Sequence, residues 1–296
     1  MDKGKMLAVI TGADGGMGRE IVSAVAKAGY HVIMACLEKE SGEKCLASLD
    51  CGAGRAEVLE LNLESFDSIR RFAGEVKAKG EPVALLANNA GVLCWNMQYT
   101  ADGLERTVGV NYAGPFLLTS LLLPLMVRGS RIVNTISCTY MIGRVGKDPF
   151  FRKGEKFWRF PFYSDSKLML TLFTLELSRR LADAGISVNA SDPGIVNTNI
   201  IRQGNIVVDK LADWFFRPVI YSPRKGASTA VRLLLDETLA GETGAIYSAC
   251  KKRRIPSYVR NNRRSGWLWT RSSEITGADM SSVCRNAVAE IKHQNN

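Results

Sequence analysis

Tyr163 and Lys167 are the two residues of this chain whose types and spacing most directly suggest chemistry. They stand four residues apart in Tyr163-Ser-Asp-Ser-Lys167, so on a helix their side chains share one face. A free tyrosine has a pKa of about 10 and is a poor base at neutral pH, and a neighbouring ammonium lowers that pKa. The spacing predicts a general acid/base pair, although an ordinary surface pair has the same spacing.

A glycine-rich turn follows the first expected strand, residues 6–10, and leads into a helix predicted to stop at Gly29. In this context Gly12 permits a tight turn, Gly16 lets the backbone approach a pyrophosphate, and Gly18 lets the helix pack close to the strand. The helix N-terminus then faces the phosphates. The turn predicts a dinucleotide site that comprises Thr11, Gly12, Gly16, Met17 and Gly18.

The residues after the second expected strand, 31–36, bear on the choice between NAD and NADP. In such folds an acid at the strand end binds the adenosine 2′-hydroxyl, and a basic residue just beyond accepts a 2′-phosphate. Here the strand ends in Cys36-Leu37-Glu38-Lys39, with neither a carboxylate at its end nor an arginine at position 37. Lys39 can reach a phosphate and Glu38 can bind a hydroxyl, so the choice stays open, with NADP slightly favoured.

Short apolar runs alternate with stretches of helical periodicity along residues 6–250. Further strands are expected at residues 57–63, 82–86, 131–137, 186–190 and 244–248. Six or seven short strands alternating with helices predict an α/β fold, one doubly wound parallel sheet of Rossmann type in a single domain. Such sheets bind ligands at the carboxyl ends of their strands.

Polar and small residues fall at or near those strand ends. Ser137 ends the fifth expected strand. Asn111 lies in a long helical region, residues 101–127, and is predicted to open that helix and hold a water that relays protons. Small or amide-bearing residues stand at the ends of the third and fourth expected strands. Such residues suit an adenine ring and let the backbone approach the cofactor closely. The cofactor residues predicted there are Asn62, Leu63, Asn89, Ala90 and Gly91.

The chain beyond the sixth expected strand is predicted to close the site. Pro193-Gly-Ile-Val-Asn-Thr198 can cover a nicotinamide carboxamide, with Pro193, Gly194, Val196 and Thr198 as cofactor contacts. Residues 197–225 are apolar without a clean period and predict a substrate lid, with a pair of packed helices as the alternative. Residues 251–296 are expected to be a basic C-terminal extension that packs on the same domain or trails from it.

The composition limits the classes of function. The 296 residues carry a net charge of +10, which suits a polyanionic partner, a membrane surface or a phosphate-bearing ligand. No apolar run is expected to span a bilayer, so no integral membrane segment is predicted, and peripheral membrane contact is left open. Seven cysteines without paired spacing and two histidines predict neither disulfides nor a metal site, and they indicate a cytoplasmic protein. The aromatic and basic residues of 138–162 are interpreted as an apolar wall beside the active site, not as a nucleic-acid surface.

Together these motifs resemble the short-chain dehydrogenase/reductase family over about residues 6–250. They occur in the family's order: the glycine turn, Asn88-Asn-Ala-Gly91, Asn111, Ser137, Tyr163-x-x-x-Lys167 and Pro193-Gly194. A finer resemblance is to the retinol-dehydrogenase-like branch. It rests on the wide gap between Ser137 and Tyr163, on the run that starts at Ile246, and on Val259-Arg-Asn-Asn262 with Leu268-Trp269 beyond it.

The resemblance implies an NAD(P)-dependent oxidoreductase that acts on an alcohol/carbonyl pair of an apolar small molecule. Tyr163 would exchange a proton with the substrate oxygen, and Lys167 would lower its pKa and bind the nicotinamide ribose. Ser137 would hold the substrate oxygen, and Asn111 the water that connects Lys167 to solvent. Leu37, Asn62 and Asp192 depart from the family pattern. A homo-oligomer stays open, and a non-catalytic nucleotide-binding regulatory protein is the alternative function.

Overall fold

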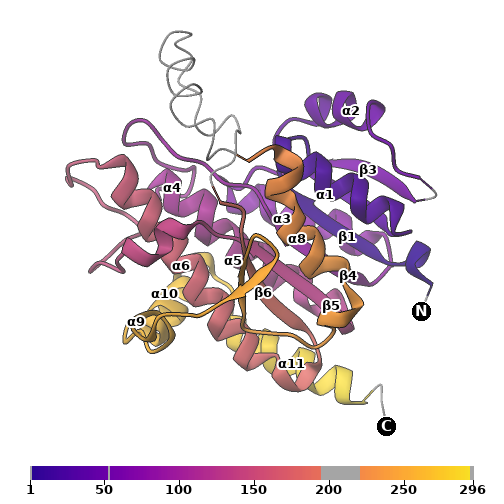
Figure 1. Cartoon of the computed structure of the whole chain (residues 1–296). Helices are drawn as coiled ribbons and strands as arrows, with labels where there is room; N and C mark the ends of the chain where they lie inside the picture. Colours follow the sequence, from indigo (N-terminus) through magenta and orange to yellow (C-terminus); the bar gives the residue numbers. More distant parts are fainter. Residues whose placement is uncertain (1, 53, 195–220, 294–296) are drawn as a thin grey trace.

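The computed structural model of the chain describes residues 2–52, 54–194 and 221–293. Its strands form one sheet in the order β3-β2-β1-β4-β5-β6-β7-β8. Strands β1 to β7 are parallel, and β8 pairs antiparallel with β7 at one edge. Helices pack on both faces of the sheet (Figure 1). The predicted doubly wound parallel sheet is confirmed.

The inner strands have side chains buried on both faces of the sheet, whereas those of the edge strands β3 and β8 are mostly half-buried or exposed. In β1, Leu7 and Val9 belong to one apolar core, and Ala8 and Ile10 belong to the other. Side chains of a strand alternate between faces, so a sheet covered by helices on both sides needs apolar residues at every position. The strands are β1 (Leu7–Thr11), β2 (His31–Cys36), β3 (Arg55–Glu60), β4 (Val83–Asn88), β5 (Met126–Thr135), β6 (Ser187–Asp192), β7 (Ile246–Ser248) and β8 (Lys251–Arg253).

The helices form one layer on each face of the sheet. Helices α3, α5 and α6 bury their apolar residues in one core, and α1, α2 and α8 pack into the other. Ser65 caps α3 by accepting a hydrogen bond from the Ser68 amide, as its position predicted. The helices are α1 (Gly16–Lys27), α2 (Lys39–Ala47), α3 (Phe66–Ala78), α4 (Arg106–Val108), α5 (Gly114–Leu122), α6 (Arg159–Arg180), α8 (Pro223–Leu235), α9 (Ser257–Arg260), α10 (Ser265–Thr276) and α11 (Met280–His293). Short turns η1 (Lys3–Lys5), η2 (Gly109–Ala113), η3 (Leu123–Leu125), η4 (Cys138–Ile142), η5 (Ala182–Ala184) and η6 (Glu237–Leu239) join them.

Two strands differ from their predictions. Strand β5 begins at Met126 rather than near residue 131, because Met126 already pairs with Val83 of β4 and residues 127–130 bulge out before Arg131 pairs with Leu85. Strand β8 lies in the basic run after residue 250, where no strand was expected. Its three side chains are all exposed, and charged residues suit an open sheet edge because they oppose pairing with another chain.

The helical stretch before β5 is longer than the run of about a dozen apolar residues expected there. Helices α4, η2, α5 and η3 join into Arg106–Leu125, which is long and apolar enough to cross a membrane. However, 83% of its most apolar window is buried inside the protein, as is typical of a core helix. The expectation that no apolar run reaches membrane-spanning length was therefore wrong, although the helical region predicted at 101–127 does cover this segment.

The C-terminal helices complete the core on one side of the sheet. Trp269 of α10 packs against Phe116 of α5 and Phe173 of α6, with ring centroids 5.7 and 6.0 Å apart. The Tyr112 and Ser272 hydroxyls form a buried 2.6 Å hydrogen bond between η2 and α10. Helices α10 and α11 thus lie against α5 and α6 (Figure 1), and the chain itself covers the apolar side of α6 that had suggested a partner subunit.

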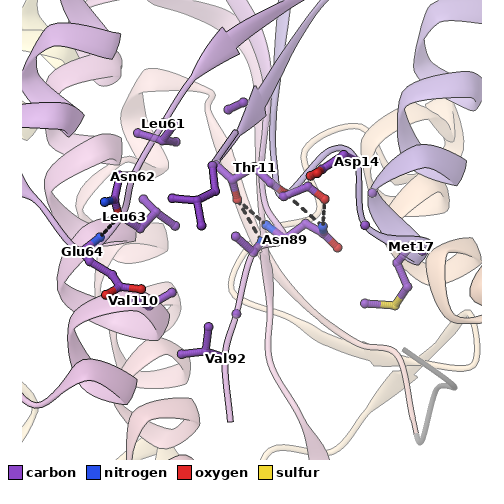
Figure 2. A pocket seen from close by; sticks show the side chains of 18 of the residues that line it. Thr11, Asp14, Met17, Leu61, Asn62, Leu63, Glu64, Asn89, Val92 and Val110 are labelled. Atoms are coloured by element: carbon purple, nitrogen blue, oxygen red, sulfur yellow. Dashed lines mark hydrogen bonds between the residues drawn. The ribbon is translucent and has the colours of Figure 1, made fainter. Parts of the chain in front are cut away.

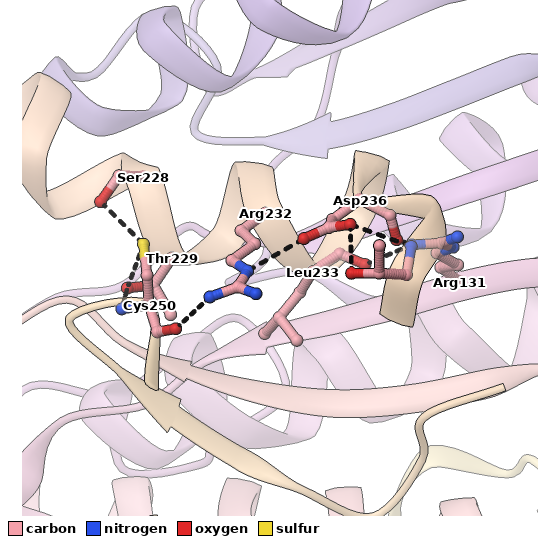
Figure 3. A network of polar contacts seen from close by, with 8 residues as sticks. Arg131, Ser228, Thr229, Arg232, Leu233, Asp236 and Cys250 are labelled. Carbon is pink, nitrogen blue, oxygen red and sulfur yellow. Dashed lines mark hydrogen bonds and ion pairs between the residues drawn. The ribbon is translucent and has the colours of Figure 1, made fainter. Parts of the chain in front are cut away.

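A polar network fastens α8 to the other face of the sheet (Figure 3). Arg131 of β5 donates to the carbonyl oxygens of Leu233 and Asp236, at 3.2 and 2.8 Å. Arg232 donates to the carbonyl oxygen of Cys250 at 2.6 Å. Cys250 and its neighbour Ala249 have positive φ in the β7–β8 turn, which is unfavourable for residues with a Cβ. We infer that α8 holds this turn in place.

Removing the Trp269 ring should test the contribution of the C-terminal helices. Trp269→Ala should lower the free energy of unfolding by about 3 kcal/mol, because truncating a buried aromatic ring loses its burial and leaves a cavity. Urea denaturation would measure the change. Phe160→Ala, which truncates a ring that is 61% exposed, is the control and should cost less than about 0.5 kcal/mol. Equal losses in the two variants would show that α10 adds no specific stability.

Candidate active site

The structure brings Ser137, Tyr163 and Lys167 together at the carboxyl edge of the sheet. Ser137 follows β5 and starts η4, whereas Tyr163 and Lys167 lie in the first turns of α6. The Ser137 side chain lies close enough to the Tyr163 hydroxyl to act as a hydrogen-bond partner that lowers its pKa. The Lys167 ammonium lies 5.6 Å from the centroid of the Tyr163 ring. The two residues share one side of the helix, as their spacing predicted.

Burial dominates the ionisation of this pair. It raises the pKa of Tyr163 to about 12, the Ser137 hydrogen bond opposes that rise, and the Asp192 carboxylate adds to it. Burial lowers the pKa of Lys167 to about 8, against the opposing effect of Asp192. The pKa of Tyr163 thus shifts in the direction opposite to the one expected from the spacing alone, because burial disfavours the phenolate more than Ser137 favours it.

Asn111 connects the loop after β4 to α6. It lies in the π-helical turn η2, so the helix is opened at this residue as predicted. Its Oδ1 accepts from the Val92 amide at 2.7 Å, and its Nδ2 donates to the Val92 carbonyl and to Ser166 Oγ. A Cβ on Gly91 would lie 3.2 Å from Asn111 Oδ1 and 3.4 Å from Lys167 Nζ. A side chain at position 91 would crowd Asn111 Oδ1, so a glycine suits the close approach of the β4 loop to both residues.

The Lys167 ammonium has a main-chain anchor that the sequence did not indicate. Its Nζ donates to the carbonyl oxygen of Thr135 at 2.8 Å, and its side chain is buried. Thr135 is the last residue of β5, and Ser137 follows it by two residues. The hydrogen bond therefore fixes the ammonium relative to the same strand end as the serine hydroxyl.

The glycine turn packs tightly against the loop after β4 (Figure 2). Thr11 Oγ1 accepts from the amides of Asn89 and Ala90 at 3.0 and 2.9 Å, and Asn89 Nδ2 donates to the Thr11 carbonyl at 2.9 Å. Gly12 has φ +60°, and a Cβ on Gly18 would lie 2.0 Å from the Gly12 carbonyl oxygen. These contacts require glycine at both positions. The tight turn and the close helix approach that were predicted are both present.

Asn88 joins β4 to the neighbouring strand β5 and to helix α5. Its Nδ2 donates to Asn134 Oδ1 of β5 at 2.8 Å and to Thr119 Oγ1 of α5 at 3.1 Å. All three side chains are buried. The loop that carries Asn89, Ala90 and Gly91 is therefore anchored at its base.

A pocket of about 380 Å³ lies along this edge of the sheet (Figure 2). Ten predicted cofactor residues line it: Thr11, Gly12, Gly16, Met17, Gly18, Asn62, Leu63, Asn89, Ala90 and Gly91. The sequence analysis did not assign Asp14, Glu64, Val92, Arg106 or Val110, which also line it. Asp14 and Glu64 adjoin predicted residues and could have been found by position, whereas Arg106 and Val110 come from a helix that only the fold brings close.

The remaining predicted residues have other positions. Lys39 does not line this pocket, and its exposed ammonium lies 3.9 Å from Glu43 on α2. Pro193 and Gly194 follow β6, where the Gly194 amide donates to Asp192 Oδ1 at 3.1 Å. Val196, Thr198 and most of the predicted lid at 197–225 lie outside the described residues. Within the described residues, no cluster of metal-ligating side chains occurs.

Comparison with protein-family models matches residues 6–206 to the family described as short chain dehydrogenase. The chain belongs to the short-chain dehydrogenase family. It is 35% identical to retinol dehydrogenase 12 of Homo sapiens over 275 residues, 91% of this chain and 85% of that protein. It is 34% identical to polyprenol dehydrogenase of Mus musculus over 282 residues, 92% of this chain and 84% of that protein. The predicted resemblance to the retinol-dehydrogenase branch is confirmed.

Solved structures share the fold of this chain. A putative uncharacterized protein from Mycobacterium Paratuberculosis superposes with a TM-score of 0.74 at 27% identity, covering 93% of this chain and 94% of that one. A blue fluorescent protein from a metagenomic library, in complex with NADPH, has a TM-score of 0.66 at 24% identity, with 84% and 97% covered. The chain is thus an NAD(P)-dependent oxidoreductase of the short-chain dehydrogenase family.

The buried Lys167 ammonium predicts a distinct pH dependence of stability. Its pKa is lowered to about 8 in the folded protein, so between that pH and about 10.5 the folded state releases a proton that the unfolded state keeps. Stability therefore rises with pH in this window, by about 3 kcal/mol relative to Lys167→Met, which lacks this titration. Denaturation of both proteins across this pH range would measure the difference.

The exposed Lys44 provides the matched control for this experiment. The stability of Lys44→Met should show the pH dependence of the wild type, because this ammonium is exposed to solvent in the folded protein as it is in the unfolded chain. A constant difference between wild type and Lys167→Met from pH 8 to 10.5 would contradict the lowered pKa of Lys167.

Proposed function

We propose that this enzyme transfers a hydride between the nicotinamide of NAD(P) and the reacting carbon of an apolar alcohol or its carbonyl counterpart, with Tyr163 as the general acid/base. The observation that carries the proposal is the placement of Tyr163 and Ser137 close together beside the buried Lys167 ammonium. Both hydroxyls converge at the sheet edge where folds of this type bind ligands. When bound, the cofactor supplies the hydride donor or acceptor at its nicotinamide ring.

Tyr163 and Ser137 would share the work on the substrate oxygen. Ser137 donates a hydrogen bond that positions this oxygen, and Tyr163 gives it a proton or takes one from it. With its pKa raised to about 12, Tyr163 is protonated at neutral pH and starts as the acid, as carbonyl reduction requires. Lys167 stabilises the phenolate that this step leaves, because its ammonium lies on the same side of α6.

The route by which Tyr163 regains its proton would pass through Lys167. The pKa of Lys167, lowered by burial to about 8, lets it release and take up a proton close to neutral pH. Asn111 lies near the Lys167 ammonium, because the ends of both side chains lie against Gly91. We propose that a water held by Asn111 connects Lys167 to solvent along this route. The opening of the helix at the π-helical turn η2 supports this proposal.

The pocket residues suit a dinucleotide. The turn at Gly12 and Gly16 offers main-chain amides at the N-terminus of α1, which is a favourable position for a diphosphate. Gly91 keeps the loop after β4 free of side-chain atoms beside Lys167, where a nicotinamide ribose is to be held. These residues would bind and orient the cofactor, and the catalytic group would then lie at the nicotinamide end.

An apolar substrate is supported by two observations. The names of the relatives, retinol dehydrogenase and polyprenol dehydrogenase, specify long apolar alcohols. The segment that leads into Tyr163 is rich in aromatic side chains: Phe157 packs edge-on against Phe162 at 5.0 Å, and Trp158 and Phe160 are exposed beside them. We propose that this segment forms the apolar wall of the substrate site.

A reducing compartment suits the cysteines of this enzyme. All seven are free, including the exposed Cys138 next to Ser137. Proteins from oxidising compartments more often pair their cysteines. We therefore propose a cytoplasmic location.

Replacing the Tyr163 hydroxyl should abolish turnover. Tyr163→Phe removes the proton-transfer group and leaves the ring, so activity should fall by at least about 100-fold while the cofactor dissociation constant stays within about twofold. Turnover of apolar aldehydes and alcohols with each nicotinamide cofactor, together with cofactor fluorescence titrations, would measure both. Tyr247→Phe, on β7 in the apolar core on the other face of the sheet, is the control and should keep full activity. Wild-type turnover in Tyr163→Phe would remove this residue from the mechanism.

A further inference from the structure

The adenosine end of the pocket contains a carboxylate that the family pattern does not place there. Asp14 lines the pocket together with Leu37, which follows β2 (Figure 2). In Rossmann-type folds the adenosine ribose lies between the glycine turn and the end of β2, where an acid normally comes from the strand. Here the strand is followed by Leu37, and the acid comes from the turn.

Neighbouring side chains fix the position of the Asp14 carboxylate. Ser41 Oγ, in the first turn of α2, donates to Asp14 Oδ2 at 2.7 Å. The buried Cys36 thiol at the end of β2 lies close to Asp14: burial raises the pKa of that thiol, and the charge of the Asp14 carboxylate raises it further. The carboxylate is therefore fixed by α2 and lies near the end of β2, the two elements that border the ribose position. It also lies at the N-terminus of α2, which is the side of a helix that attracts an anion.

The cations among the described residues do not offset this negative charge inside the pocket. Arg106 is the one cation that lines it, and its guanidinium pairs with Glu64, which also lines it, at 2.7 Å. Lys39 does not line the pocket and lies 3.9 Å from Glu43. Arg19 of α1 donates to Ser48 at 3.4 Å and does not line the pocket either. A 2′-phosphate beside Asp14 would thus meet a fixed negative charge with no cation facing it.

We propose, on the basis of the proposed function, that Asp14 makes this enzyme select NAD(H) over NADP(H). Its carboxylate accepts a hydrogen bond from the free adenosine ribose hydroxyl of NAD(H) and repels the 2′-phosphate of NADP(H). The slight preference for NADP expected from the sequence depended on Lys39, and the position of Lys39 outside the pocket removes that support.

Fluorescence titrations of the full chain with NADH and NADPH test this proposal. The wild type should bind NADH on the order of tenfold or more tighter than NADPH. Asp14→Asn removes the charge at constant shape, and it should bring the two dissociation constants to within about threefold, mainly by tightening NADPH. Glu43→Gln removes one charge from α2 outside the pocket, and it should keep the wild-type ratio.

The outcomes separate this proposal from the proposed function. Equal or tighter binding of NADPH by the wild type would overturn the selection of NAD(H), while leaving the oxidoreductase function intact. An unchanged ratio in Asp14→Asn would overturn the role of Asp14. Binding of neither cofactor would overturn the proposed function itself. If Asp14→Asn does not fold, the ratio of the NADPH and NADH dissociation constants of the wild type is measured at increasing salt concentration. Salt screens charge repulsion, so this ratio should become smaller. A ratio that does not change with salt would refute charge repulsion by Asp14.

Discussion

A lysine ammonium buried under the carboxyl edge of the sheet is the constraint on which the rest of the site depends. A charge in such a place is costly unless fixed partners surround it. The structure supplies the Thr135 carbonyl as a hydrogen-bond acceptor and the Asp192 carboxylate as a nearby opposite charge. Each partner comes from the end of a strand, so Lys167 can be accommodated only where β5, β6 and the start of α6 meet.

The same requirement explains why so much of the chain serves to hold α6 in place. The helix carries both Tyr163 and Lys167, and a small shift would separate the hydroxyl from Ser137. On one side it packs on the sheet, and on the other it contacts α10 through the ring of Trp269. The hydrogen bond between Tyr112 and Ser272 extends this support to η2, which contains Asn111. The C-terminal helices thus stabilise the catalytic arrangement without touching it.

Local steric rules made part of this arrangement predictable from the sequence. The glycine turn and the position of Ser137 follow from what a strand, a turn and a strand end require. Properties set by the whole fold were not predictable. The raised pKa of Tyr163 depends on the burial of its side chain in the fold. The position of the Lys39 side chain outside the pocket depends on α2, which begins at this residue. The aromatic partners of Trp269, Phe116 and Phe173, lie more than ninety residues away in the chain, so no local pattern indicated them.

The most direct test of the account follows the hydride itself. The enzyme would be incubated with apolar aldehydes and nicotinamide cofactor carrying deuterium at the reactive ring carbon, and the alcohol products would be analysed by mass spectrometry. The account predicts that deuterium appears on the former carbonyl carbon with the wild-type enzyme and is absent with a phenylalanine at position 163. Cofactor that binds in the pocket but passes no deuterium to any carbonyl in a broad apolar panel would contradict it.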